Sequence, residues 1–464
     1  TIDTVIEGFS TTLWLKIGDG VLEVPLETLE ELEPDELYDN LELFSQLSGL
    51  KQQLKTGATA AHAEKTLQAW AAQYGTAVRL PKAKSTGSAV PSTLRMSDFQ
   101  KLIGEAPDTP AATSVDDLIA QIVGPHVKVD TGNEALNAAV DEALTSAMRL
   151  VLHHPEFQAL ESQWRTLDLL ARNIETDDSL ELILYDISAE EIAADLANAD
   201  DLSDSGLLRL LGESALETGR GGFSALIGLY TFEETPPHAE LLGRIARVAA
   251  HIDAPFIAAI GARSLDTKPD DQSQITRDAW AALKAMPEAA YLGLATPRFL
   301  LRRPYGARSE PTYAFPFEEF SLQSGTRAML WANPAALAAV LLAQSYTQNG
   351  KTMKLGSVLT LGDQPYHIVI DRHGDQVALP CTERNITEAK ANAAIDRGYM
   401  PVLSLKGRDQ IRLGGFGALS GDLLRGPWID TPPPPPSATK PEPPSPVAAP
   451  SPAPTPVVDD RLFV

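Results

Sequence analysis

Two adjacent histidines beside a carboxylate form the run most suggestive of chemistry. His153 and His154 precede Pro155 and Glu156, so two imidazoles and a carboxylate lie within four residues. A metal site on a helix needs histidines at i and i+4 and further ligands elsewhere. Here a proline interrupts the run, and the sequence shows no second cluster of ligands. The spacing instead favours the start of a helix, with His154 at the cap position, Pro155 first in the helix and Glu156 in its first turn.

Two glycine-containing runs resemble fragments of phosphate-binding loops. Gly350-Lys351-Thr352 has the end of the P-loop pattern, but that pattern needs a glycine where Ser345 stands and a strand where a helix is predicted. Residues 219–222 precede a predicted strand, whereas a phosphate loop follows one. We therefore expect no bound nucleotide, no metal and no other cofactor.

The candidate nucleophiles are equally isolated. Ser224 lacks the second glycine of a nucleophile elbow, and it enters a predicted strand instead of leaving one. Cys381 has no histidine near it in the sequence, so we expect a structural thiol. Residues 371–375 are explained more simply as a hairpin turn than as a catalytic pair. The sequence predicts no catalytic residue and no enzyme.

Composition limits the remaining classes of function. The 464 residues suffice for two or three domains of about 150 residues each. The net charge, 38 − 62 = −24, argues against nucleic acid or an anionic membrane as a partner. The longest apolar run, Ala335–Ala343, is far shorter than the roughly 20 residues of a membrane span. One cysteine permits no internal disulfide, and no signal peptide is visible, so we expect a cytoplasmic protein.

The first 74 residues carry the pattern of a small α+β unit. Val5–Leu15 predicts a passage from helix to strand, and Val21–Leu26 alternates like a half-buried strand. Pro34-Asp35-Glu36 suits the first turn of a helix, where carboxylates meet the positive end of the helix dipole. Apolar residues recur at three- and four-residue spacing from Leu37 to Leu54, which predicts one helix face with a break at Gly49.

Two predicted linkers separate this unit from the rest of the chain. Residues 81–93 and 106–114 are rich in Pro, Ser, Thr, Ala and Gly, with a short helical signal at 98–103 between them. Ser114 then caps a predicted amphipathic helix that has acids in its first turn. The apolar face of this helix consists of Val115, Leu118, Ile119, Ile122 and Val123.

From residue 134 onward helices and strands alternate, which predicts an α/β layer with largely parallel strands. Helices are predicted over 134–151, 156–171, 239–250, 334–346 and 387–397, and another after Ser188. Strands are predicted over 180–185, 224–230, 255–260, 402–405 and 411–413. The runs 358–361 and 366–370 flank Gly362-Asp363 and predict a hairpin. The prolines of 432–436 open a tail that we expect to be extended and disordered.

Several runs in this region together resemble the large subunit of the type VI secretion contractile sheath, TssC. They begin with Leu152–Glu161 and Trp164-Arg165 and continue, in the family's order, through 225–232, 254–259, 291–302, 304–306, 317–319 and 330–334. The residues that carry the resemblance most clearly are His154, Pro155, Phe157, Trp164, Arg165, Pro255, Pro297, Arg298, Trp331, Asn333 and Pro334. The order of so many matches over about 300 residues makes the resemblance specific.

The N-terminal segment is similar to part of the small sheath subunit, TssB. The match is carried by Val24-Pro25-Leu26, Leu29, Leu32 and Pro34–Leu37. The chain is therefore predicted to join a small-subunit-like segment (1–74), a linker (75–113), an amphipathic helix with a further linker (114–133), a large-subunit-like region (134–428) and a Pro-rich tail (429–464). The expected fold class is α/β: a sheath-type mixed sheet flanked by helices, with a small N-terminal α+β segment and a disordered tail.

The resemblance implies a structural function and a set of partners. Sheath subunits stack as helical rings around an inner tube, exchange strands with their neighbours, and contract to drive the tube outward from the cytoplasm. Partners would be other sheath subunits, the inner tube protein, the baseplate and an AAA+ unfoldase that binds the helix of residues 115–123, although this helix could instead pack on its own domain. After Gly421 the chain departs from the family pattern. An alternative is therefore a non-polymerising adaptor or cap that binds the sheath end, the baseplate or the unfoldase.

Overall fold

The computed structural model describes most of the N-terminal unit and nearly all of the region from residue 133 to residue 428. The described residues are 2–17, 20–55, 65–67, 69–70, 133–199, 201–213, 222–267, 271–370 and 373–428. The predicted linkers within 75–113, the helix of residues 115–123 and the Pro-rich tail lie outside the described residues.

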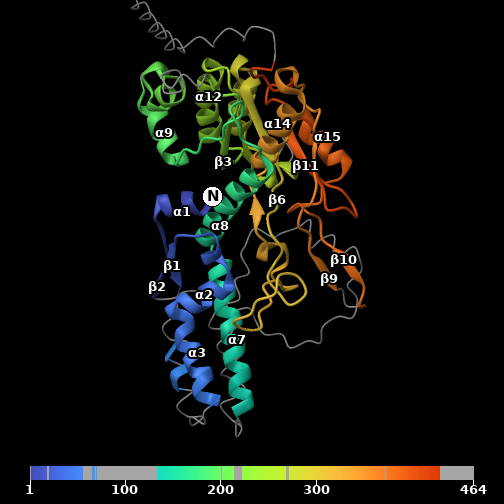
Figure 1. Ribbon diagram of the computed structural model, residues 1–464. Helices are drawn as coiled ribbons and strands as arrows, with labels where there is room; N and C mark the ends of the chain where they lie inside the picture. The colour runs from blue at the N-terminus through green and yellow to red at the C-terminus, as the bar shows by residue number, and fades with distance from the viewer. Residues whose placement is uncertain are drawn as a thin grey trace, which may run out of the picture.

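The first elements form a small unit of helices and a hairpin (Figure 1). Helix α1 (Ile2–Phe9) leads into strand β1 (Thr11–Ile17), which pairs antiparallel with β2 (Gly20–Leu26). Along both strands, buried or half-buried residues alternate with exposed ones, as expected when one face of a sheet covers a core. The predicted passage from helix to strand and the predicted second strand are both confirmed.

The next two helices differ from prediction in where they break. Helix α2 (Pro34–Asn40) begins at the predicted proline, and α3 (Glu42–Lys55) follows after Leu41, whose backbone is extended. The predicted break at Gly49 is wrong, because Gly49 lies inside α3 with open space where a Cβ would be. The chain bends at Leu41 instead, and this bend keeps Leu41 buried in the same core as Leu37 and Phe44.

Two long helices join this unit to the rest of the molecule. Helix α7 (Asn133–Leu152) lies beside α3, and α8 (Pro155–Asn173) contacts α1 and β1. Buried residues of all these elements share one core with Tyr305, Phe315 and Phe317. The N-terminal unit is therefore part of a core that α7, α8 and a distant loop complete.

A six-stranded sheet forms the upper part of the molecule in Figure 1. Its strand order is β3-β4-β5-β11-β12-β8, in which β3, β4, β5 and β11 are parallel and the last two strands are antiparallel. The six strands are β3 (Leu226–Phe232), β4 (Phe256–Ile260), β5 (Leu292–Thr296), β11 (Tyr399–Ser404), β12 (Ile411–Leu413) and β8 (Thr360–Leu361). The predicted α/β layer with largely parallel strands is confirmed.

The remaining described elements surround this sheet. The helices are α9 (Ala189–Asn198), α10 (Gly206–Leu208), α12 (Pro236–His251), α13 (Gln274–Ala285), α14 (Ala335–Asn349) and α15 (Glu388–Asp396). Two separate strand pairs are β6 (Phe299–Leu300) with β7 (Trp331–Ala332), and β9 (Ile368–Ile370) with β10 (Gln376–Ala378). Short 3₁₀ turns lie at Glu30–Leu32, Leu202–Asp204, Ala262–Leu265, Pro287–Tyr291, Gly325–Ala328 and Gly350–Thr352, and a π-helical turn at Arg209–Glu213.

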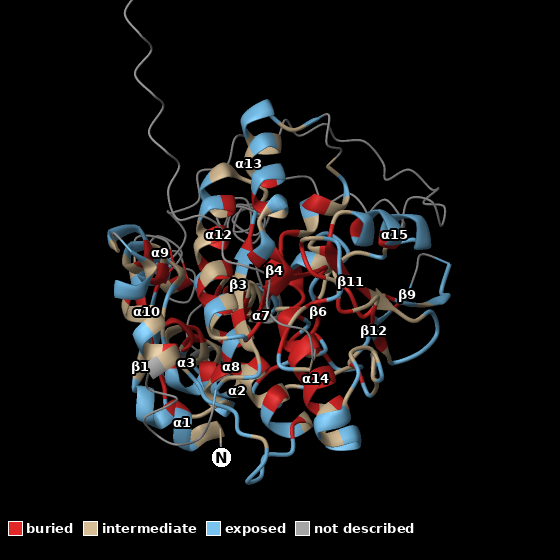
Figure 2. Ribbon diagram, turned by 90° about the horizontal axis from the view of Figure 1, so that it is seen from above, coloured by how far each residue is buried: buried red, intermediate tan, exposed pale blue. Residues whose placement is uncertain are grey.

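Helices cover both faces of the sheet. Helix α14 packs on a core that contains Ile257 and Ala295, while α12 and α13 pack on a core that contains Ala258 and Leu294. Neighbouring residues of β4 and β5 therefore point into opposite cores, which explains why these strands are apolar throughout. Figure 2 shows the buried residues concentrated along these strands and α14. Among the described helices, none is both long and apolar enough to cross a membrane.

Two strand predictions are wrong. Residues 180–185 form no strand and pair with no strand of the described chain; only Leu180 makes an isolated bridge, to Asp177. The runs 358–361 and 366–370 do not pair with each other, because β8 adds to β12 at the sheet edge while β9 pairs with β10. The hairpin is therefore β9–β10, in which Ile370 pairs with Gln376. Residues 371 and 372 of the turn predicted over 371–375 lie outside the described residues.

The end of α15 provides a test of the fold. Gly398 has a φ of +80°, and a Cβ there would lie 2.7 Å from the Leu419 carbonyl oxygen, whereas Gly407 has a φ of +70° and open space. We expect Gly407→Ala to lower the free energy of unfolding by about 1 kcal/mol, from backbone strain alone. Gly398→Ala should lower it by about 2 kcal/mol more, because backbone atoms must move apart. Urea unfolding measures both; equal losses would contradict the packing of Gly398.

Candidate functional site

The runs that suggested chemistry in the sequence have structural roles. The His154 Nδ1 accepts a hydrogen bond from the Glu156 N–H at 3.3 Å and caps α8, which begins at Pro155 as predicted. Lys351 lies in a single 3₁₀ turn after α14. The Cys381 thiol is buried, and burial raises its pKa. Within the described part of the chain, no group of three or more His, Cys, Asp and Glu side chains could hold a metal ion.

A cavity of about 380 Å³ lies beside the loop that follows β6. Its lining combines Arg302 and Arg303 with the carboxylates of Glu310, Asp363 and Asp409. The lining contains no serine, cysteine or histidine, so the cavity brings together no pair of nucleophile and base.

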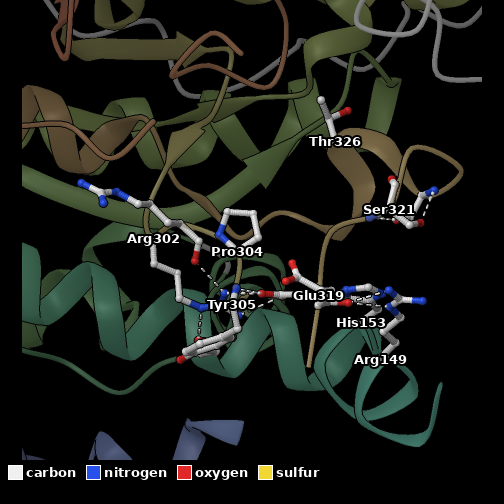
Figure 3. A network of polar contacts seen from close by, with 12 residues as sticks. Arg149, His153, Arg302, Pro304, Tyr305, Glu319, Ser321 and Thr326 are labelled. Atoms are coloured by element: carbon white, nitrogen blue, oxygen red, sulfur yellow. Dashed lines mark hydrogen bonds and ion pairs between the residues drawn. The ribbon is translucent and has the colours of Figure 1, made fainter. Parts of the chain in front are cut away.

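The unusual chemistry of the molecule is a cluster of buried charges between α8 and the loop of residues 301–319 (Figure 3). Glu161 on α8 is 0 % exposed and Glu319 is 1 % exposed. The Arg302 guanidinium lies between the two carboxylates, with only a tenth of its side chain exposed. Buried ionised groups are rare unless they are paired, and these three are paired with one another.

Arg302 contacts both carboxylates with two nitrogens each. Its Nε donates to Glu161 Oε1 at 2.7 Å and its Nη2 to Glu161 Oε2 at 3.2 Å. Its Nη1 donates to Glu319 Oε2 at 2.7 Å and its Nη2 to Glu319 Oε1 at 3.1 Å. The fork of the guanidinium thus satisfies two buried carboxylates at once, an arrangement that lysine could not provide.

A second arginine and a tyrosine complete the cluster. Arg165, one turn along α8, donates from Nε to Glu161 Oε1 at 2.7 Å and from Nη2 to the Tyr305 hydroxyl at 3.1 Å. The Tyr305 backbone N–H donates to Glu319 Oε2 at 2.8 Å, and the Arg302 Cζ lies 4.2 Å from the centroid of the Tyr305 ring. Two glutamates therefore balance two arginines, and the formal charge of these four side chains is zero.

The pKa values of the Glu161 and Glu319 carboxyl groups are shifted in opposite directions by their surroundings. Burial alone would raise the pKa of Glu161, but Arg302 and Arg165 outweigh it and hold this pKa below its ordinary value. Burial raises the pKa of Glu319, and the nearby Arg302 offsets the increase only in part. Burial tends to lower the pKa of Arg302, but the two carboxylates raise it well above its usual range. The arginine therefore stays charged, and Glu161 is the more firmly ionised of its partners.

The cluster extends to the end of α7. The Arg149 Nε donates to the Glu318 carbonyl oxygen at 3.0 Å, and the His153 Nε2 lies 3.8 Å from Glu319 Oε1. His153 Nε2 is buried without a hydrogen-bond partner among the described residues. Burial, together with the positive charges of Arg302 and Arg149, lowers the pKa of His153 to about 4. This imidazole is therefore neutral at physiological pH.

The N-terminal unit is attached to the same loop and helix. Asp35, in the first turn of α2, accepts hydrogen bonds from the N–H groups of Tyr313 at 3.0 Å and Ala314 at 2.9 Å. The Tyr38 ring stacks on Phe315 with 5.0 Å between the ring centroids. Glu33 lies 3.9 Å from Arg165, at the rim of the charge cluster. One loop thus contacts α2 on one side and the buried charges on the other.

The sequence contains one signal for this cluster, and it lies outside any catalytic motif. Glu161 lies on the face of α8 that also carries Phe157, one helical turn before it, and Trp164, one turn after it. A carboxylate on an apolar helix face indicates a buried charge that needs a cation. Its main partner, Arg302, is 141 residues away, so the spacing within the helix could not identify it.

The structure places the residues that carry the TssC resemblance in separate parts of the fold. Phe157 and Trp164 are buried in the core shared with the N-terminal unit, where Trp164 packs edge-on against Phe9 at 5.6 Å. Pro255 precedes β4, and its carbonyl accepts from the Leu226 N–H at 2.8 Å.

The remaining family residues hold loops around the sheet. Pro297 follows a cis peptide bond, and Arg298 donates to Glu383 from Nη2 at 2.7 Å. The Trp331 Nε1 donates to the Thr326 carbonyl at 3.0 Å. Asn333 bridges β3 and α14: its Nδ2 donates to the Tyr230 carbonyl at 3.0 Å, and its Oδ1 accepts from the Ala335 N–H at 2.9 Å. Pro334 is the cap residue of α14. Of the eleven residues singled out for the resemblance, Arg165 lies within the charge cluster. The matching runs 152–161, 291–302, 304–306 and 317–319 supply its other members, Glu161, Arg302, Tyr305 and Glu319.

Fold and site together define an α/β protein whose buried charges pair with one another and join segments distant in the sequence. The chain belongs to the VipB family of tail sheath proteins: residues 134–419 match the family described as EvpB/VC_A0108, tail sheath N-terminal domain. The resemblance to the large sheath subunit is thereby confirmed.

A relative supports the same family. The chain is 33 % identical over 296 residues to the type VI secretion system sheath protein TssC1 of Pseudomonas aeruginosa. The match covers 60 % of this chain and 59 % of the relative, so the chain spans about three fifths of the relative's length.

Removal of one charge from the cluster tests its structural role. We expect Glu161→Gln to lower the free energy of unfolding by about 3–5 kcal/mol, because Arg302 and Arg165 would remain buried without their shared anion. The matched control is Asp168→Asn on the same helix, which breaks an i,i+4 pair with the exposed Arg172 and should cost less than about 1 kcal/mol. Urea unfolding at pH 7 measures both losses. Similar losses in the two variants would show that the buried cluster contributes no more to stability than an exposed ion pair.

His153 predicts a pH dependence of stability. Because its folded-state pKa of about 4 lies below the ordinary 6.5, the unfolded chain binds more protons between these values, and stability falls as the pH falls from about 6.5 to 4. Between pH 7.5 and 5 we expect a loss of about 2 kcal/mol from this group. His153→Gln should remove that part of the loss in urea unfolding, while His251→Gln, at an exposed histidine, should retain it. An unchanged pH profile in His153→Gln would contradict the burial of a neutral imidazole.

Proposed function

We propose that this chain is a structural subunit of a type VI secretion contractile sheath, in which a small-subunit-like segment and a large-subunit-like region form one body. The subunit assembles in the cytoplasm with other sheath subunits around an inner tube, on a baseplate, and contraction of the assembly drives the tube and its effectors outward. The match of residues 134–419 to the tail sheath family is the observation that carries this proposal.

The packing of the N-terminal unit supports the idea of a fused subunit. Its helices and hairpin share one core with α7 and α8, which lie inside the family match. Asp35 and Tyr38 attach α2 to the loop of residues 313–315 by hydrogen bonds and ring stacking. A segment that resembles the small sheath subunit thus completes the core of the large-subunit-like region in the same chain.

The buried charges suit a subunit that transmits force. A network of this kind adds less stability than apolar packing would, but it specifies one arrangement of the segments that supply its members. Here those segments are α8 and the loop of residues 301–319, with α2 at the rim. A subunit with a fixed internal arrangement passes displacement to its neighbours instead of deforming.

The alternative function is that of a sheath-like adaptor or cap, which binds the sheath end, the baseplate or the unfoldase without polymerising. In either function, we propose that an AAA+ unfoldase recognises residues 115–123. The sequence predicts an amphipathic helix there, whose apolar face would carry Val115, Leu118, Ile119, Ile122 and Val123.

Electron microscopy of the full chain, expressed alone and with neighbouring sheath-like and tube-like proteins, distinguishes these functions. We expect tubes or stacked rings, and we expect Asp35→Ala combined with Tyr38→Ala to reduce their number at least tenfold, because α2 loses its attachment. The matched control is Asp39→Ala, at an exposed residue of the same helix, which should assemble normally.

Two other results would have clear meanings. Particles found only at the ends of partner tubes would replace the sheath subunit by the adaptor. Monomers that bind none of the co-expressed proteins would contradict both functions.

A further inference from the structure

The segment between α8 and α9 has the sequence of a strand but no partner. Leu182, Ile183 and Leu184 are consecutive apolar residues whose side chains are each more than two fifths exposed. Their backbone N–H and C=O groups make no hydrogen bond with any other residue that the structure describes. Three adjacent exposed apolar residues with free backbone groups are unusual on the surface of a monomer.

Contacts at both ends hold this segment in place. On one side, Leu180 packs against the core beneath α14, and its N–H donates to the Asp177 carbonyl at 3.3 Å. On the other side, the Tyr185 ring packs edge-on against Phe223 at 6.2 Å, and the Ile187 carbonyl accepts from the Tyr230 hydroxyl at 2.5 Å. Tyr230 belongs to β3, the edge strand of the sheet. The segment is therefore anchored beside the sheet edge with its middle exposed.

The segment and its flanks in the sequence carry charge of one sign. Residues 175–191 contain no lysine or arginine, and all of their acidic side chains are exposed. The acidic residues are Glu175, Asp177, Asp178, Glu181, Asp186, Glu190 and Glu191. A second copy of the same segment would bring like charges together, so pairing between copies is unfavourable.

We propose that residues 181–187 form a docking surface for an extended, basic segment of another protein, with apolar and basic residues alternating along it. Such a segment would pair with the free backbone groups of residues 182–184, place its apolar side chains on Leu182 and Leu184, and direct its lysines or arginines toward the surrounding carboxylates. The inference goes beyond the proposed sheath function and does not depend on it. The surface is separate from the N-terminal unit and from the buried charges, so its failure leaves the sheath proposal standing.

The first test uses the full chain and a fluorescent ten-residue peptide in which lysine alternates with valine. We expect saturable binding by fluorescence anisotropy, weakened at least tenfold between 50 and 500 mM NaCl, and protection from hydrogen exchange confined to residues 181–187. A peptide of alternating lysine and serine, and a lysine–valine peptide with N-methylated backbone amides, should each bind at least tenfold more weakly. Equal binding of the lysine–serine peptide would overturn the proposal, because attraction between lysines and the acidic chain would then account for the binding without any apolar contact.

Variants of the protein give the second test. Leu182→Asp should weaken binding of the lysine–valine peptide at least tenfold, because Leu182 belongs to the face on which the peptide's apolar side chains would lie. Ile275→Asp, at an exposed isoleucine on α13, should leave the affinity within twofold. The double variant Glu175→Gln with Asp178→Asn should weaken peptide binding at least threefold. The matched control is the double variant Glu23→Gln with Glu27→Gln in the N-terminal unit, which removes the same charge and should weaken binding less. Matching urea unfolding curves confirm that all variants are folded. Unchanged affinity in Leu182→Asp, or exchange protection elsewhere on the molecule, would refute the docking surface.

Discussion

A single buried carboxylate, Glu161, sets the constraint on which much of this structure depends. It is fully enclosed, and it ionises there only because Arg302 and Arg165 both donate to it. A buried charge without such partners would cost several kcal/mol. The chain must therefore bring the loop that carries Arg302 against α8, and that loop also carries Glu319 and the residues that hold α2. The position of the N-terminal unit follows from how this one charge is neutralised.

Around this constraint the molecule is built in two parts that share helices. The lower part is the N-terminal unit with α7 and the first half of α8; the upper part is the sheet between α14 and the pair α12 and α13 (Figure 1). Helix α8 contributes to the cores of both parts, through Phe157 and Trp164 below and Leu170 above. In the proposed sheath, α8 would be the element through which displacement passes between the small-subunit-like and large-subunit-like portions.

Local signals made much of this fold predictable from the sequence. The starts of α2 at Pro34 and of α8 after His154, and the end of α15 at Gly398, follow from caps and turns that act over a few residues. The failures concern pairing over long distances. A strand needs a neighbour, and the run 180–185 has none within the described chain. Likewise, β8 pairs with β12 and not with β9. The residues of 358–370 alone do not determine this pairing, because β12 lies about 50 residues further along the chain. The sequence near Glu161 likewise does not identify its partner Arg302, which lies 141 residues away.

Native-state hydrogen exchange of the full chain, compared between the wild type and Glu161→Gln, tests the central claim most directly. If the buried charges join the N-terminal unit to α8, the slowest amides of α2, α3 and α8 should open with one common free energy in the wild type. All of them should then lose protection together in the variant, while the amides of β4 and β5 lose less. Exchange of α2 and α3 that is independent of α8 in the wild type, or unchanged by Glu161→Gln, would contradict the account.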